Sequence, residues 1–276
     1  MTVALLLTAV MAATFASPAG AATGSAATGP AGAGARNFYL SLGDSVPVWD
    51  GSHSFPRLLL SHYAGDVPKL TLVNMAVSEA TTTSMLDTGQ YTQALQFLDK
   101  HEGRVALITI DIGGNDIVHC ASPTGIDLTC VAAGLASVTT NLTTMLAGLH
   151  KAAPGVPIIG MEVYDPYLGD WLAGGAARAL ALATIPVATA LNGELSSLYG
   201  PSSTADVQDV FRTADDTTLV RSRWGQVPVD VDRACSWLWI VCRPGHEEGF
   251  ADDPTSAGQV HIAAAFERTI GRLSAP

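Results

Sequence analysis

The chain has 276 residues, of which 48% are hydrophobic and 14% are charged, which is enough for one large α/β domain or two small domains. Its 25 acidic and 14 basic residues give a formal net charge of -11, and such a surface repels phosphate backbones, so we expect no nucleic-acid partner. The low share of charged residues, together with many Ala, Gly and Thr residues, indicates a folded and soluble protein rather than a disordered acidic chain.

The N-terminal residues have the pattern of an export signal. The apolar run VALLLTAVMAATFA has the length of a signal-peptide core and is followed by an Ala-Gly-Ala cleavage pattern, although no Lys or Arg precedes it. The run is shorter than the roughly 20 residues that a bilayer span needs. We therefore predict a signal peptide at residues 1–21 and a secreted, extracellular protein, with no integral membrane span elsewhere in the chain.

Residues 22–36 form a low-complexity, Ala/Gly-rich linker that cannot bury a core, so we expect the folded domain at residues 37–276. In this domain, apolar runs rich in Val, Ile and Leu predict buried strands at residues 37–42, 69–76, 104–112 and 156–164. Amphipathic or Ala-rich patterns predict helices at residues 55–64, 91–101, 131–150, 171–199 (interrupted at Pro186) and 256–273 (with Ser256 as candidate N-cap). The alternation predicts an α/β fold with one parallel sheet covered by helices on both faces.

Polar residues follow each of the predicted strands. Asp44 and Ser45 follow the first strand, residues 74–82 end and follow the second, Gly114 and Asn115 follow the third, and Asp165 follows the fourth. The tripeptide Gly-Asp-Ser alone is typical of an ordinary turn. Because ligands of parallel sheets bind at the carboxyl ends of the strands, however, these residues are expected to share one rim and form a site there.

The four cysteines fit an exported protein. They allow three disulfide connectivities, of which the local one, Cys120 with Cys130 and Cys235 with Cys242, is the simplest in an oxidising compartment. If the chain were not exported, four buried thiols would be expected instead. No pair has the spacing of a zinc finger, so we expect neither a structural metal nor a cofactor.

Four segments in this order, YLSLGDSV, NMAVSEATT, ITIDIGGND and DPTSAGQVHIAAAF, resemble the GDSL/SGNH hydrolase family of serine esterases and lipases. The resemblance covers residues 37–272, and MEVYDPYLGDW with the paired cysteines is similar to the secreted actinobacterial-type members. It implies a three-layer α/β/α sandwich of flavodoxin-like type, with a central sheet of about five strands. It further implies Ser45 as nucleophile and the Asn115 side chain as an oxyanion donor, with Asp44, Gly114 and Asp165 contacting the substrate.

Three positions depart from the family pattern, one of which is the acid position of the fifth block, where Ala251 or, with a gap, Asp252 stands. The second family block carries a glycine whose N–H completes the oxyanion hole, and Glu79 stands in its place. A residue with a side chain reaches the glycine conformation less easily, and its carboxylate opposes an oxyanion. The fifth block carries an acid and the catalytic histidine, whereas Asp253 stands at the histidine position. A serine hydroxyl without a neighbouring base is a weak nucleophile.

Other groups are candidates for the missing base. His246, in RPGHEEGFADD, belongs to the loop expected to cross the rim, with Glu247 and Asp252 nearby as orienting acids. Asp253 is a poor base at an ordinary pKa near 4 but a better one if burial and Glu79 raise it. His53 and His119 are less favoured, and His261 is expected on a helix face. A cation site built from Asp44, Glu79 and Asp253 is a further, weaker alternative.

Two functions remain at this stage. The first is a secreted, monomeric serine ester hydrolase that acts on acyl or acetyl esters of a lipid, a glycan or a small molecule, with its base displaced or weakened. The second is a catalytically inactive relative that uses the cleft to bind a glycan or a lipid, because loss of the base, the acid and the glycine together is what relaxed selection on chemistry would leave.

Overall fold

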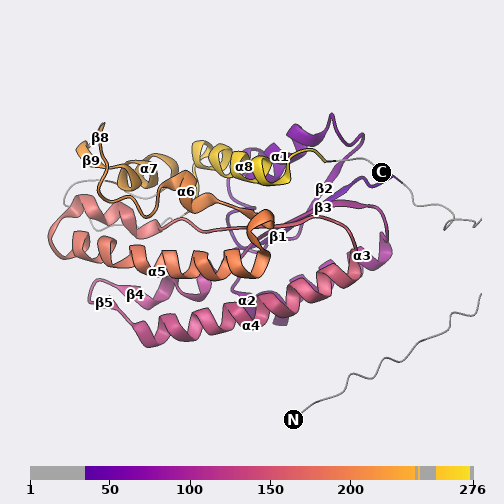
Figure 1. Cartoon of the computed structure of the whole chain (residues 1–276), viewed down its shortest axis with the longest axis horizontal. Helices are drawn as coiled ribbons and strands as arrows, with labels where there is room; N and C mark the ends of the chain where they lie inside the picture. The colour runs from indigo at the N-terminus through magenta and orange to yellow at the C-terminus, as the bar shows by residue number, and fades with distance from the viewer. Residues whose placement is uncertain (1–34, 240–241, 243–252, 274–276) are drawn as a thin grey trace, which may run out of the picture. The chain divides into compact units, whose positions relative to one another are not determined.

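The computed structural model describes residues 35–239, 242 and 253–273, and all elements named below belong to one compact unit of the chain. Its centre is a five-stranded parallel sheet in the order β2-β1-β3-β6-β7 (Figure 1). The strands are β1 (Phe38–Gly43), β2 (Thr71–Asn74), β3 (Val105–Asp111), β6 (Ile158–Met161) and β7 (Thr204–Ala205). The predicted α/β class and the number of strands are confirmed.

Helices cover both faces of this sheet. The α-helices are α1 (Phe55–Tyr63), α2 (Thr82–Asp87), α3 (Gln90–Lys100), α4 (Leu128–Ala152), α5 (Gly175–Tyr199), α6 (Val207–Phe211), α7 (Val229–Trp237) and α8 (Ser256–Ile270). Short 3₁₀ helices are η1 (Gly51–His53), η2 (Gly114–Asp116), η3 (Val118–Cys120), η4 (Pro166–Ala173) and η5 (Pro201–Ser203). Two small antiparallel hairpins pair β4 (Ala121–Ser122) with β5 (Gly125–Ile126) and β8 (Leu219–Ser222) with β9 (Gly225–Pro228).

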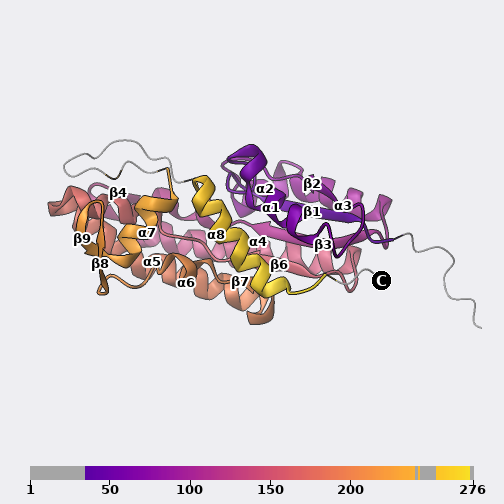
Figure 2. The same cartoon turned by 90° about the horizontal axis from the view of Figure 1, so that it is seen from above.

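Alternate residues of each strand point to opposite faces of the sheet, where two separate hydrophobic cores form. In β3, Leu107 faces the core that contains α1 and α8, whereas Ile108 and Ile110 face the core that contains α4 and α5. In Figures 1 and 2, α1 and α8 lie side by side above the sheet, and Figure 1 shows α4 and α5 below it. Because consecutive strand residues point to opposite faces, an uninterrupted apolar strand is buried on both sides.

Several details differ from the sequence prediction, which did not include α2, α6 and α7. Helix α5 continues through Pro186 without interruption. Pro186 is exposed, so water can hydrate the carbonyl group that loses its helical partner. The N-cap of α8 is Thr255, whose hydroxyl accepts the Gly258 N–H at 3.3 Å, rather than Ser256. Strand β7 and both hairpins are too short to leave a periodic signal.

The helices α4 and α5 are both long and apolar enough to cross a membrane, which the sequence analysis did not anticipate. Length and composition alone are weak support, because core helices meet the same criteria. Both helices bury one face against the sheet here, with Val138 and Leu142 from α4 and Leu191 and Leu195 from α5 in the same core.

The two local disulfides expected from the sequence are present. Cys120 is bonded to Cys130 and Cys235 to Cys242, each with a Cα–Cα distance of 5.5 Å. The first disulfide joins η3 to the start of α4 and thereby closes the β4–β5 hairpin. The second joins α7 to the segment that follows it.

Candidate active site

A pocket opens at the carboxyl ends of β1, β3 and β6, where the sequence analysis placed the site. Ser45, Asn115 and all three predicted substrate contacts, Asp44, Gly114 and Asp165, line it. Most of the remaining wall is apolar, from Val46, Ile117, Val118, Ala121, Ile126, Val131, Met161, Val163, Tyr164, Pro166, Tyr167, Val187, Ala188 and Leu191. The cavity volume is about 90 Å³. The residues of three separate loops therefore meet in one small, largely apolar pocket.

The end of β1 fixes the position of Ser45. Gly43 has a φ of +143°, and a Cβ atom at this position would lie 2.2 Å from the Asp111 carbonyl oxygen, so a glycine is required. The Asp44 N–H donates to the same carbonyl at 3.1 Å, which keeps β1 and β3 paired up to the site. The carbonyl of Ser45 accepts the N–H groups of Val48 and Trp49 at 2.9 and 2.8 Å, which closes the following turn.

Asn115 is held by the first turn after β3. Its side-chain nitrogen donates to the Ala80 carbonyl at 3.1 Å and to Asp44 Oδ2 at 3.3 Å. Both amide hydrogens are therefore engaged, and an incoming oxyanion would have to displace one acceptor. The adjacent Asp116 accepts the N–H of Thr82 at 2.8 Å and its hydroxyl at 2.6 Å, which ties the loop before α2 to the loop after β3.

Glu79 occupies the conformation that a glycine would take. Its φ is +64°, in the left-handed region that side chains disfavour, so the chain keeps the expected backbone geometry without the glycine. The residue is exposed and does not line the pocket. The Glu79 backbone N–H thus remains the candidate donor, while the carboxylate has access to solvent.

Buried carboxyl groups surround the end of β1. Asp44 and Asp111 are 6% and 1% exposed, and both line the pocket. Burial raises the pKa of Asp111 well above 3.8, and the charge of Asp44, a hydrogen bond with Asp44 and the charge of Asp253 raise it further. Two carboxyl groups this close cannot both ionise at low cost, which is why Asp44 adds to the rise in the pKa of Asp111. Burial, and then the charges of Asp111 and Asp44, likewise raise the pKa of the Tyr199 hydroxyl.

Asp165 supplies a third buried carboxyl group on the opposite wall. It caps η4 by accepting the Tyr167 N–H at 2.9 Å, and it is 2% exposed. Burial raises its pKa to about 6, an effect that hydrogen bonds from Thr184 and the Tyr167 backbone only partly offset. Both Asp165 and Thr184 line the pocket, which gives this wall a polar patch beside Tyr164.

The pocket wall contains no histidine in the part of the chain that the structure describes. His119 Nε2 lies 3.4 Å from Cys130 Sγ, against the disulfide. His261 stacks on Trp237 with ring centroids 3.8 Å apart, as expected for a helix-face residue, and burial lowers its pKa. His53 is exposed in η1. The favoured base, His246, lies outside the described residues.

Asp253 is described, and it lies near this site without lining the pocket. Its carbonyl accepts the Trp239 N–H at 2.9 Å, and its charge acts on Asp111. The candidate cation site of Asp44, Glu79 and Asp253 does not form. Among residues 35–239, 242 and 253–273, only His119, Cys120 and Cys130 bring three possible ligand atoms within 4.8 Å of one another, and both sulfurs are in a disulfide.

The sequence analysis missed two buried residues at this site, Asp111 and Gln90. Asp111 ends a buried strand whose other residues are apolar except Thr109, and a carboxyl group in such a run was the available signal. Gln90 starts α3, and nothing in its local sequence indicates that its side chain reaches the backbone of β1.

Comparison with known proteins places the chain in a family. Residues 41–219, which are more than half of the chain, match the model of the GDSL-like lipase/acylhydrolase family. No curated protein matches the sequence significantly.

Solved structures share the fold at low sequence identity. A candidate GDSL-like lipase from Parabacteroides merdae has a TM-score of 0.57 at 16% identity, over 86% of this chain and 96% of that one. Phospholipase A1 from Streptomyces albidoflavus has a TM-score of 0.55 at 18% identity, over 87% of this chain and all of that one (100%). The lipase Lip_vut3 from a goat rumen metagenome has a TM-score of 0.54 at 14% identity, over 86% and 98%. The match over residues 41–219 shows that this chain belongs to the GDSL-like lipase/acylhydrolase family.

Proposed function

We propose that the protein hydrolyses carboxylic esters in the pocket at the end of β1, with Ser45 as nucleophile. The observation that carries this proposal is that Ser45 and Asn115, which come from different loops, line one small and mostly apolar pocket. A hydroxyl group and an amide donor facing the same cavity can hold a carbonyl group between them.

In the proposed reaction, Ser45 Oγ attacks the ester carbonyl carbon while a base takes its proton. The oxyanion receives hydrogen bonds from the Asn115 amide and from the backbone N–H groups of Ser45 and Glu79. Asn115 exchanges its contact with Asp44 or with Ala80 for the oxyanion. The intermediate then collapses, the alcohol leaves with the proton from the base, and water hydrolyses the acyl-enzyme by the same steps.

The proposed base is His246, with Asp253 as the second candidate. A histidine titrates near neutral pH and takes a serine proton far more readily than an ordinary carboxylate does. In favour of Asp253, its charge acts on Asp111, which lines the pocket, so the two carboxyl groups lie near each other.

Hydrolysis of a p-nitrophenyl ester series tests this function. Wild-type protein is expected to cleave the esters, and Ser45→Ala is expected to fall to the uncatalysed rate. Next, His246→Ala is compared with Asp253→Asn and with His150→Ala, an exposed histidine at the end of α4 that serves as the control. A large loss for one of the first two variants identifies the base. Equal rates for wild type and Ser45→Ala would reject the proposal for these esters.

A second candidate function is binding of a lipid or glycan ester without cleavage. The described part of the pocket wall has no histidine, and both hydrogens of the Asn115 amide are already bonded, which favour this alternative. Binding of an ester with equal affinity by wild type and Ser45→Ala, in the absence of turnover, would support it.

We also propose that the protein is exported after cleavage of residues 1–21. The two disulfides support an oxidising compartment, in which such bonds persist. The mass of the protein recovered from the culture medium tests this proposal, and recovery of the whole chain from the cytoplasm alone would reject it.

A further inference from the structure

A second, larger cavity lies between α5, the β4–β5 hairpin and the start of α4. Its volume is about 690 Å³, and we call it the α5 groove. It is lined by Pro123, Thr124, Gly125, Ile126, Leu128, Val131, Ala176, Ala179, Leu180, Ala183, Pro186, Val187 and Ala190. Of these described residues none is charged, and the Thr124 hydroxyl is the one polar side-chain group among them.

The α5 groove adjoins the pocket at Ser45. Ile126, Val131 and Val187 line both cavities, so the same three side chains form the wall between them. Val187 belongs to α5, Ile126 to β5 and Val131 to the start of α4. Val131 follows Cys130, whose disulfide closes the β4–β5 hairpin. A ligand that starts at Ser45 and passes these side chains would enter the groove.

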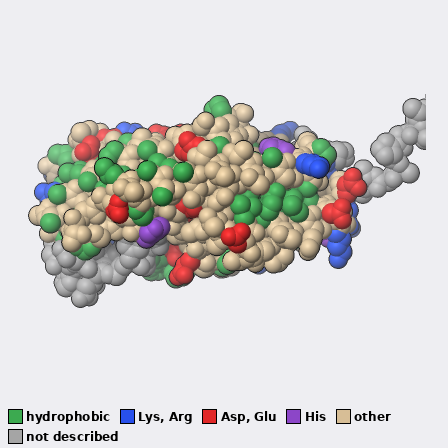
Figure 3. All heavy atoms as spheres, turned by 90° about the horizontal axis from the view of Figure 1, so that it is seen from below, with side chains coloured by type: hydrophobic (Ala, Val, Ile, Leu, Met, Phe, Trp, Pro, Cys, Tyr) green, Lys and Arg blue, Asp and Glu red, His purple; other side chains and the backbone are tan. Residues whose placement is uncertain are grey.

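The groove also leaves apolar surface accessible to solvent. Leu128, at its rim, is 70% exposed. Figure 3 shows the face formed by α4, α5 and the hairpin, where hydrophobic side chains gather over the left half. Contiguous exposed apolar surface beside a polar site is typical of a surface that binds an apolar ligand.

We propose that the α5 groove holds the acyl chain of a long-chain ester whose carbonyl group lies at Ser45. This inference rests on the proposed ester-hydrolase function and names its substrate class. The pocket at Ser45 has about 90 Å³ against about 690 Å³ for the groove, so a long chain must leave the pocket to be buried. A glycan or a peptide in the groove would leave its polar groups without partners there, whereas an alkyl chain has none to satisfy.

The variant Ala183→Trp tests the groove, because Ala183 is exposed and lines the groove but not the pocket. Each buried methylene contributes about 0.8 kcal/mol, roughly a fourfold change in kcat/KM. We expect wild type to prefer p-nitrophenyl decanoate to the butanoate, and Ala183→Trp to lower the ratio of the two kcat/KM values about tenfold or more. Ala136→Trp is the control, since Ala136 is exposed on α4 and lines neither cavity. An unchanged ratio in Ala183→Trp would overturn the proposal.

A binding measurement separates failure of the groove from failure of the enzymatic proposal. Glycerol ethers with butyl, octyl and dodecyl chains contain no ester, and their affinity for Ser45→Ala protein is measured by calorimetry. We expect affinity to rise with chain length and Ala183→Trp to abolish the rise. This outcome supports the groove even if no ester is cleaved, whereas equal affinity for all three ethers overturns it even if short esters are cleaved.

Discussion

The side chain of Gln90 forms two hydrogen bonds with the backbone of Gly43. The Gly43 N–H donates to Gln90 Oε1 at 2.9 Å, and Gln90 Nε2 donates to the Gly43 carbonyl at 3.0 Å. Gln90 is 3% exposed and is the first residue of α3, which begins 47 residues after Gly43. The amide therefore satisfies the buried Gly43 N–H where β1 turns toward Ser45, and it gives the Gly43 carbonyl a second donor beside the Val77 N–H at 3.0 Å.

Substitution of Gln90 should weaken the fold and the site together. In Gln90→Ala the Gly43 N–H loses its partner in a buried setting, at a cost of about 1–3 kcal/mol, whereas the Gly43 carbonyl keeps the Val77 N–H at 3.0 Å. We expect a loss of about 1–3 kcal/mol in the free energy of unfolding, measured with urea, and a lower rate of ester cleavage. Gln93→Ala, an exposed position on the same helix, is the control and should change stability by less than about 0.5 kcal/mol.

Gly43 itself should not accept a side chain. In Gly43→Ala the new Cβ atom would meet the Asp111 carbonyl oxygen at 2.2 Å, and alanine disfavours a φ of +143°. The backbone must shift next to Ser45, so we expect a loss of about 2–4 kcal/mol in the free energy of unfolding. Gly193→Ala in α5 provides the contrast. Nothing lies within 4 Å of its notional Cβ, and it should gain about 0.5–1 kcal/mol from helix propensity. A tolerated Gly43→Ala would contradict the close approach of β1 and β3.

What the sequence could predict at this site was local. Ser45 and Asn115 each follow an apolar strand, and parallel strands end at the same edge of the sheet, so their arrival in one pocket required no knowledge of distant contacts. The hydrogen bonds of Gln90 depend on how α3 docks, and the raised pKa of Asp111 beside Asp44 depends on the register of β1 and β3. Neither relationship is encoded in the residues near each group. Residues 204–205 form a strand only because they pair with the edge of β6.

The buried Asp111 carboxyl should make stability depend on pH. Its folded pKa is raised above 3.8, so its contribution is fully present below that value and is lost as pH rises through the folded pKa. Asp111→Asn carries no charge at any of these pH values and can still bond Asp44. We expect the variant to gain stability relative to wild type as pH rises above 4, by at most about 1.4 kcal/mol per pH unit, in urea titrations at each pH. If the difference in the free energy of unfolding between the variant and wild type does not grow with pH, Asp111 ionises in the folded protein without a loss of stability.

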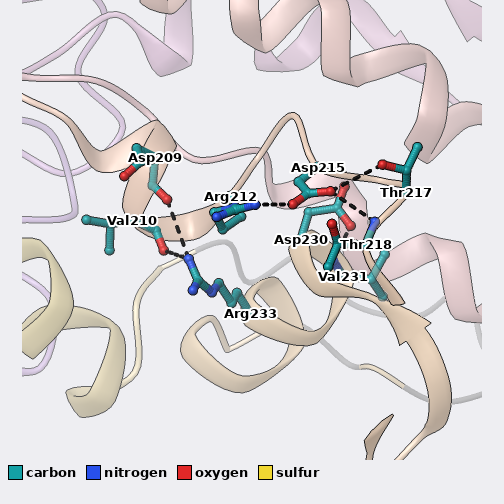
Figure 4. A network of polar contacts seen from close by, with 9 residues as sticks. All are labelled: Asp209, Val210, Arg212, Asp215, Thr217, Thr218, Asp230, Val231 and Arg233. Carbon is teal, nitrogen blue, oxygen red and sulfur yellow. Dashed lines mark hydrogen bonds and ion pairs between the residues drawn. The ribbon is translucent and has the colours of Figure 1, made fainter. Parts of the chain in front are cut away.

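Asp215 should show the opposite sign. It pairs with Arg212 and accepts the Thr218 N–H at 3.0 Å, in the network of Figure 4. These hydrogen bonds lower its pKa to about 2, so its contribution is present above 3.8 and is lost as pH falls through 2. Asp215→Asn should therefore be less stable than wild type at neutral pH, and the two curves should meet near pH 2. The stability differences of Asp111→Asn and Asp215→Asn from wild type therefore have opposite signs, which distinguishes a buried carboxyl group from an ion-paired one in a single experiment.

The disulfide of Cys120 and Cys130 should matter for the site as well as for stability. It closes the hairpin whose Ile126 lines both the pocket and the α5 groove. Replacing both cysteines with serine should lower the free energy of unfolding by about 2–3 kcal/mol and reduce the preference for long acyl chains. The matched pair is Cys235 and Cys242, neither of which lines either cavity, so its removal should lower stability and leave the chain-length ratio unchanged. A change in this ratio in the second variant would point to a general loss of structure instead.

Glu79→Gly should improve both stability and the proposed chemistry. At a φ of +64° a residue with a side chain destabilises the folded state by about 1–2 kcal/mol. Because glycine has greater freedom in the unfolded chain, part of this gain is offset, and we expect the free energy of unfolding to rise by about 0.5–1 kcal/mol. Removing the carboxylate next to the candidate oxyanion donor should also raise the rate of ester cleavage. Two controls separate these effects. Glu79→Gln removes the charge but keeps the backbone strain, and Lys69→Gly relieves a φ of +62° away from the pocket. If Glu79→Gly gains no more in rate than Lys69→Gly does, the Glu79 carboxylate does not oppose an oxyanion at this site.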